Sequence, residues 1–210
     1  MRAILSVLLL AASGLAVLLA PPSYAGTTAR SSALVTSVVV VRPVHADGTP
    51  VAGWTVHRER GRVFCDGASP AAVRRGIVSC SPSAAYVPAC WRSAHHTVLC
   101  LRDPSVHVLV RIRYAGAFPE VAKPAVATPL AMRLFDGVFC QIRVGGAWGV
   151  PPGHPHWVGF DSCDSGGDVY GPRRDDGIIR TRPLWWVRQV DGQEVHRRAV
   201  RTAYLVGTAH

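Results

Sequence analysis

The chain alternates short apolar runs with turn-forming residues along most of its length. The runs have strand length and are rich in β-branched and aromatic residues: 35–42, 54–57, 76–80, 97–102, 106–114, 130–135, 138–143, 157–161, 184–190 and 199–206. Glycine, proline and Asp-Gly pairs separate them. Only 70–75, with Ser69 as N-cap, suits one or two helical turns. We predict an all-β fold, either a disulfide-stapled β-sandwich or a pair of small packed β units, with at most one short helix.

The first residues, 1–25, follow the pattern of a secretory signal peptide. Arg2 supplies the positive end, 4–20 is apolar, and Ala25 closes a small-residue cleavage site. The apolar run is at the short end of the ~17–25 residues that span a membrane, and no basic cluster follows it. We expect cleavage after Ala25, no transmembrane segment afterwards, and a protein that is secreted and at most loosely associated with the cell wall.

Composition divides the remaining chain into two halves. We predict a flexible mature N-terminus at 26–33, a β unit with four cysteines at 34–118, a Pro/Ala-rich linker at 119–129, and a β unit with two cysteines at 130–210. Both halves contain a strand ending in Val-Phe-Cys followed by a strand ending in Ser-Cys. This repeat suggests two related β units, each closed by a disulfide.

Six cysteines in an exported chain indicate a disulfide framework. Pairing of sequence neighbours gives Cys65–Cys80, Cys90–Cys100 and Cys140–Cys163, although other connectivities stay open from the sequence. Loops of this length contribute roughly 3 kcal/mol each in the chain-entropy account. A zinc site would need close Cys-x2–4-Cys pairs, and the sequence contains none. We expect no metal and no cofactor.

The net charge of +10 comes almost wholly from arginine, because Lys123 is the only lysine. Such a charge attracts polyanions such as wall polymers or anionic lipids. It also follows from the codon usage of a GC-rich genome, which we favour because the arginines are spread along the chain. Nucleic-acid binding is not expected, since no basic segment with interleaved aromatic residues is present.

The segment 163–167, Cys-Asp-Ser-Gly-Gly, resembles the nucleophile loop of chymotrypsin-like serine proteases. The resemblance implies Ser165 as nucleophile, with His95 or His96 as base. The position that is glycine in that family is Cys163 here, and Asp168 replaces the closing proline. We therefore interpret this segment as a flexible turn, expect no catalytic residue, and keep a small secreted serine hydrolase as the alternative function.

The aromatic residues suggest a binding surface. Trp148 lies in a glycine-rich segment, Gly145-Gly146-Ala147-Trp148-Gly149, and exposed tryptophan beside arginine is typical of carbohydrate-binding platforms. Packing of these rings in the core is the competing interpretation. If the chain binds a ligand, we expect the site at Trp148, Arg143, His154 and His156. The histidine pairs alone do not make a metal site.

Several segments resemble a group of secreted actinobacterial proteins, particularly mycobacterial ones, that have no known activity. The resemblance rests on Arg62-Val63-Phe64-Cys65, Gly76-Ile77-Val78-Ser79-Cys80, Ala89-Cys90-Trp91, Val98-Leu99-Cys100-Leu101-Arg102-Asp103-Pro104, Gly145-Gly146-Ala147-Trp148-Gly149, Arg182-Pro183-Leu184-Trp185 and 202–209. It implies export from a high-GC Gram-positive cell and transfers no catalytic residue. Our leading hypothesis is a non-catalytic binding or structural module, envelope-associated or extracellular. Its partner would be an anionic envelope polymer or an extracellular protein.

Overall fold

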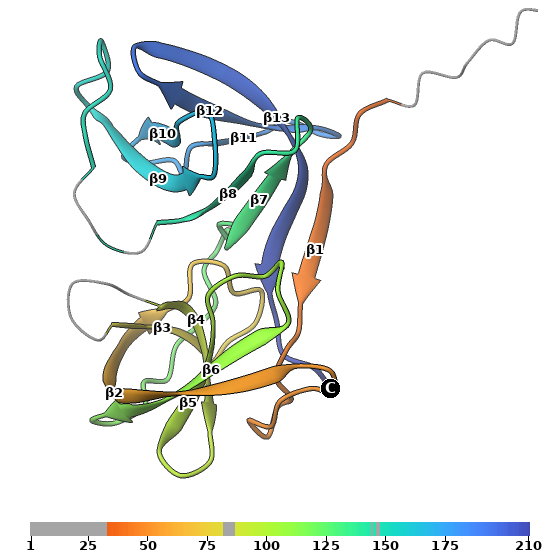
Figure 1. The fold of residues 1–210 in the computed structure, drawn as a ribbon, viewed down its shortest axis with the longest axis vertical. Coiled ribbons are helices and arrows are strands. Elements are labelled where there is room, and N and C mark those ends of the chain that lie inside the picture. The colour runs from red at the N-terminus through yellow and green to blue at the C-terminus, as the bar shows by residue number, and fades with distance from the viewer. Residues whose placement is uncertain (1–32, 82–86, 144, 146–147) are drawn as a thin grey trace, which may run out of the picture. The chain divides into compact units, whose positions relative to one another are not determined.

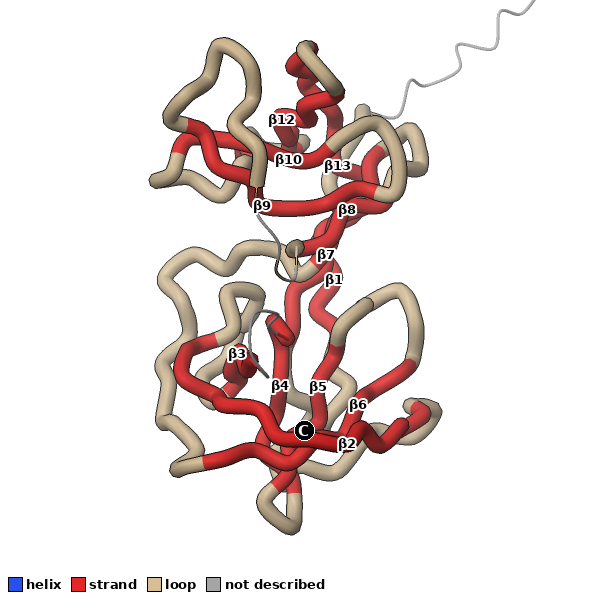
Figure 2. Tube along the Cα trace, turned by 60° about the vertical axis from the view of Figure 1, so that its left-hand side comes forward, coloured by secondary structure: helices blue, strands red, loops and turns tan. Residues whose placement is uncertain are grey.

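The computed structural model describes residues 33–81, 87–143, 145 and 148–210. The predicted signal peptide and most of the predicted flexible N-terminus lie outside these residues. The described chain contains strands and no helix (Figures 1 and 2): β1 (Ser37–Val41), β2 (Thr55–Ala68), β3 (Ile77–Ser81), β4 (Val87–Ser93), β5 (Thr97–Leu101), β6 (Val108–Ala115), β7 (Ala131–Leu134), β8 (Phe139–Ile142), β9 (Trp157–Cys163), β10 (Asp168–Pro172), β11 (Ile178–Arg180), β12 (Trp185–Asp191) and β13 (Glu194–Val206).

The first barrel is the closed sheet β2-β3-β4-β5-β6. Neighbouring strands run antiparallel, and the barrel closes through a parallel pairing of β2 with β6, beginning at Thr55 opposite Val108. Because successive side chains point to opposite faces of a strand, the apolar residues form two clusters. One surrounds the disulfides of this barrel, and the other contains Trp91 and Leu99.

The second barrel is formed by β7, β8, β9, β10, β12 and β13. These strands pair in the order β13-β7-β8-β9-β10-β12, and an additional pairing of β12 with β13 closes the ring. The long strand β13 makes this possible because its first half pairs with β12 and its second half pairs with β7. Met132, Leu134, Val187 and Val200 are among the residues of its apolar core. Closure leaves few unpaired sheet edges.

The all-β prediction and the pair of packed β units are confirmed. Two details differ. The strand β1, which we assigned to the first unit at 34–118, pairs in parallel with β13 and so extends the sheet of the second barrel. The segment 70–75, expected as one or two helical turns, forms a turn instead, because Ala72 pairs with Val206 in an isolated β-bridge. The β-bridge to Val206, which is distant in sequence, thus outweighs the preference of Ser69 to cap a helix.

The three disulfides pair as expected, Cys65–Cys80, Cys90–Cys100 and Cys140–Cys163. Each joins two residues that stand directly opposite one another on adjacent antiparallel strands. The repeat in the sequence therefore has a structural counterpart, since both barrels contain a pair of neighbouring strands linked by a disulfide. Within the described part of the chain, no helix has the length and apolar character needed to cross a membrane.

Candidate functional site

A cavity of about 750 Å³ opens on the second barrel beside Trp148, and we call it the Trp148 cavity. Its lining combines apolar and aromatic side chains with charged ones: Pro70, Val126, Thr128, Ile142, Arg143, Trp148, Gly159, Phe160, Arg173, Arg174, Asp175, Asp176, Ile178 and Arg180. The strand β9 places Gly159 and Phe160 in the wall, and the turn after β10 supplies the arginine doublet and the two acids. Such a mixture suits a ligand that has both an apolar surface and anionic groups.

Trp148 is a fixed wall of this cavity. Its indole lies directly over Gly159, where a Cβ atom would collide with the six-membered ring. The guanidinium of Arg143 lies 4.4 Å from the indole centroid, and the ring of Tyr170 meets it edge-on at 5.5 Å. These contacts hold the half-buried indole in one orientation, so a ligand would meet a preformed surface.

A second hollow of about 560 Å³ is also lined by this tryptophan. Trp148 and Arg173 line both hollows, and His156 and Trp157 belong to the second one. The ring of His154 stacks on that of Trp157, with centroids 3.8 Å apart and an interplanar angle of 20°. The four binding residues expected from the sequence therefore lie at these two hollows. Arg143 and Trp148 line the Trp148 cavity, and His156 lines the second hollow. His154 stacks on Trp157, which lines the second hollow.

The two acidic residues that line the Trp148 cavity both form ion pairs with arginine. Asp175 pairs with Arg188 at 3.1 Å, and Asp176 pairs with Arg180. Burial raises the pKa of Asp176, but the hydrogen bond and charge of Arg180, with hydrogen bonds from the Thr128 hydroxyl and the Ile178 amide, outweigh it, so the pKa lies below its usual value. This carboxylate therefore stays charged and bound to its arginine.

Arg173 and Arg174, by contrast, are exposed at the cavity mouth and form no ion pair within the described residues. Each presents the planar fork of donors that recognises carboxylate, sulfate and phosphate. The sequence alone gave no reason to connect this doublet with Trp148. The turn chemistry of the following Asp-Asp-Gly segment was the available signal that this doublet lies at a surface corner.

Asp161 is a buried carboxyl group that the sequence did not single out. It lies on β9, one residue after Phe160, with its side chain inside the second barrel, and neither carboxyl oxygen has a hydrogen-bond partner among the described residues. Burial, followed by the charges of Asp176 and Asp168, raises the pKa of Asp161 to about 8. An acidic residue inside a strand otherwise expected to be apolar was the signal that reasoning from sequence passed over.

The Ser165 segment forms an exposed turn between β9 and β10. The side-chain amide of Gln189 donates to the carbonyl oxygens of Ser165 and Gly167, at 3.0 and 3.3 Å. His95 and His96, the bases that the resemblance implied, lie on the first barrel in the turn between β4 and β5 and line a different hollow. Within the described chain, no hydrogen bond joins either histidine to Ser165, so neither is positioned as its base.

Cysteines supply the only group of three metal-ligating side chains that lie close together in the described residues. These are Cys80, Cys90 and Cys100, and all three sulfurs are bonded in disulfides. A disulfide sulfur is not the thiolate that binds a metal ion, so this cluster is structural.

The Trp148 cavity thus combines an aromatic wall with exposed arginines that form no ion pair among the described residues. The chain matches no protein family, no curated protein and no solved structure.

Proposed function

We propose that this protein is a non-catalytic extracellular module that binds an anionic polymer of the cell envelope in the Trp148 cavity. The observation that carries the proposal is the position of the Trp148 indole, a fixed wall shared by two hollows, with Arg173 lining both. A sugar ring presents an apolar face that packs on an indole, while acidic substituents pair with guanidinium groups.

Three disulfides support an oxidising, extracellular location. The sequence pattern of a signal peptide favours the same location. The second hollow, which Trp148 also lines, favours a polymer over a small molecule, because an extended ligand can lie along both hollows and contact Trp157 as well. The cationic mouth favours an anionic polymer over a neutral one.

The test is co-sedimentation of the disulfide-intact protein with purified envelope polysaccharide over a series of salt concentrations. Retention that persists at high salt is expected, because contacts with an aromatic wall are not screened by ions. Trp148→Ala should weaken retention about tenfold or more, as expected for the loss of a central aromatic contact. Arg173→Gln with Arg174→Gln should weaken it mainly at low salt.

Trp186→Ala is the matched control. Trp186 is half-buried and also carries an arginine over its ring, Arg197 at 4.7 Å, but it lines neither hollow. Equal losses in the two tryptophan variants would contradict the proposal and indicate a general loss of packing. Labelling of Ser165 by a serine-reactive phosphonate would contradict the non-catalytic assignment.

A further inference from the structure

Five arginines gather on one surface of the first barrel, although they are spread over two distant parts of the sequence. Arg58, Arg60 and Arg62 lie on β2, and Arg111 and Arg113 lie on β6. They line three adjoining hollows of about 540, 280 and 280 Å³, and Arg113 lines all of them. We call this surface the arginine groove.

The strand register stacks these arginines in pairs. In the parallel pairing of β2 with β6, Arg58 stands opposite Arg111 and Arg62 stands opposite Arg113. Ile112, between the two β6 arginines, is buried in the apolar cluster on the other face. Like charges directly opposite each other destabilise a sheet. The two pairs, which are separated by a register shift of β2 between Arg58 and Arg62, therefore have an electrostatic cost that a bound anion would offset.

The acidic residue nearest to the groove does not neutralise it. Glu59 lines two of the hollows, but both of its carboxylate oxygens accept hydrogen bonds from Arg102, each at 2.8 Å. None of the five groove arginines forms an ion pair within the described chain, and the Nε atom of Arg111 is buried without a hydrogen-bond partner there. The groove is a cluster of uncompensated guanidinium groups.

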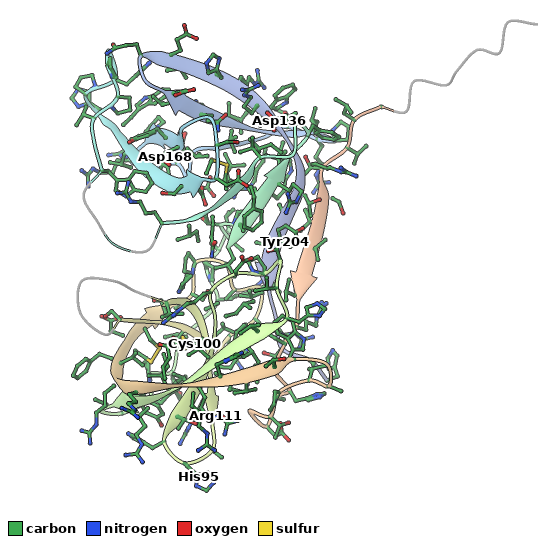
Figure 3. The ribbon with its side chains drawn as sticks, in the orientation of Figure 1. His95, Cys100, Arg111, Asp136, Asp168 and Tyr204 are labelled. Atoms are coloured by element: carbon green, nitrogen blue, oxygen red, sulfur yellow. A yellow bond between two sulfur atoms is a disulfide. The ribbon has the colours of Figure 1, made fainter. Side chains whose placement is uncertain are left out.

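A strained turn completes the rim of the groove. His95 and His96 lie in the three-residue turn between β4 and β5 and have φ angles of 55° and 57°, in the left-handed region that glycine and asparagine adopt most readily. Both line a hollow of the groove, and His95 lies near Arg111 at the same end of the barrel (Figure 3). The ring of His96 stacks on Tyr114 with centroids 4.0 Å apart. Strain retained at a surface turn is typical of binding sites.

We propose that the arginine groove is a second ligand site, which binds a glycan bearing sulfate or phosphate monoester groups. Each of these groups has three terminal oxygens, so two guanidinium groups on one rung can both donate to it. A carboxylate has two oxygens, which one guanidinium fork occupies. The rungs at Arg111 and Arg113 are roughly 6.7 Å apart along the strand, which allows two anionic groups to bind side by side.

The shape and lining of the groove favour a glycan over other polyanions. The arginines line concave hollows, into which a chain fits better than a flat bilayer does. The aromatic ring in the lining, that of Tyr114, is buried under His96 and offers no free face for a nucleobase. This site does not depend on the Trp148 cavity, because the two linings share no residue.

The proposal is tested with four polymers that share the dextran backbone: dextran sulfate, dextran phosphate, carboxymethyl dextran of matched charge density, and unmodified dextran. We expect the disulfide-intact protein to bind the sulfate or the phosphate form at least about tenfold more tightly than the carboxymethyl form, in ~0.15 M salt. The tighter of the first two identifies the natural substituent. Equal affinity for the carboxymethyl form would overturn the proposal.

Arg62→Gln with Arg113→Gln removes one rung and should weaken binding of the preferred dextran about tenfold or more. Arg75→Gln with Arg201→Gln removes the same charge from exposed sites outside the groove and should change binding by less than about twofold. Equal losses in the two double variants, or preferential binding to phosphatidylglycerol vesicles, would overturn the proposal. Trp148→Ala should retain dextran binding, which separates failure of this proposal from failure of the Trp148 site.

Discussion

The indole of Trp148 rests on the backbone of Gly159, at the one position of β9 where the absence of a side chain lets the ring approach the strand. A Cβ at Gly159 would stand inside the volume that the indole occupies. Because Trp148 lines both hollows, the size of residue 159 determines where this shared indole lies. The glycine thus has a specific role in shaping the candidate site.

Replacing Gly159 by alanine tests this relationship. The added methyl should displace the indole, lower the unfolding free energy by about 1–3 kcal/mol and weaken polymer retention nearly as much as Trp148→Ala does. Gly149→Ala is the control for stability, because a Cβ there meets no atom within 4 Å. Urea unfolding and co-sedimentation measure the two effects. Unchanged retention in the Gly159 variant would show that the position of the wall does not matter for binding.

Thr36 should be important for joining the segment before β1 to the second barrel. Its buried hydroxyl donates to the carbonyl of Val200 at 2.7 Å and accepts from the amide of Trp185, also at 2.7 Å. Thr36→Val keeps the shape but leaves both backbone groups without this partner, so we expect a loss of about 1–3 kcal/mol in urea unfolding. Thr36→Ser keeps the hydroxyl and should lose much less. Equal losses in both variants would assign the effect to packing.

The fold was predictable where the signal is local. Alternating apolar residues and Asp-Gly turns indicated the strands, and the cysteines paired with their neighbours because each disulfide joins adjacent antiparallel strands. The partner of β1 was not predictable in this way. Its pairing, Ser37 opposite Thr202, is parallel and connects the two ends of the described chain, and no local feature specifies it.

The candidate sites were predictable to different degrees for the same reason. Arg143, Trp148, His154 and His156 lie within one short stretch of sequence, so their clustering was expected. The arginine groove was not, because it exists only once barrel closure places β2 beside β6. Arginines that seem spread along the chain are thereby gathered on two rungs. The codon usage expected from the sequence would account for the number of arginines, but not for this register.

Asp161 should make the protein less stable as the pH rises. Its pKa is about 8 in the folded protein, against about 3.9 in an unfolded chain. Between these values the folded state holds a proton that the unfolded state has released. The stabilisation from this group is therefore complete below about pH 4 and decreases up to about pH 8, by at most about 1.4 kcal/mol per pH unit.

Asp161→Asn removes the titration, so the difference in unfolding free energy between the variant and the native protein should shift in favour of the variant from pH 5 to pH 8. Urea unfolding at several pH values measures this difference. Asp191→Asn, at the exposed end of β12, is the control and should leave the pH profile of the native protein unchanged. If the unfolding free energies of the native protein and of Asp161→Asn change in parallel with pH, Asp161 is ionised, or has a partner, in the folded state.

The strained turn at His95 predicts opposite effects on stability and on binding. His95 lies in a three-residue turn with a φ of 55°, and asparagine adopts this left-handed conformation more readily than histidine. His95→Asn should therefore raise the unfolding free energy by about 0.5–1 kcal/mol. The imidazole lines two hollows of the arginine groove, and its loss should weaken binding of the preferred dextran severalfold. Urea unfolding and dextran titration of the same variant measure both quantities. A variant that gained stability and bound dextran as well as the native protein would show that the strain at His95 serves no purpose in the groove.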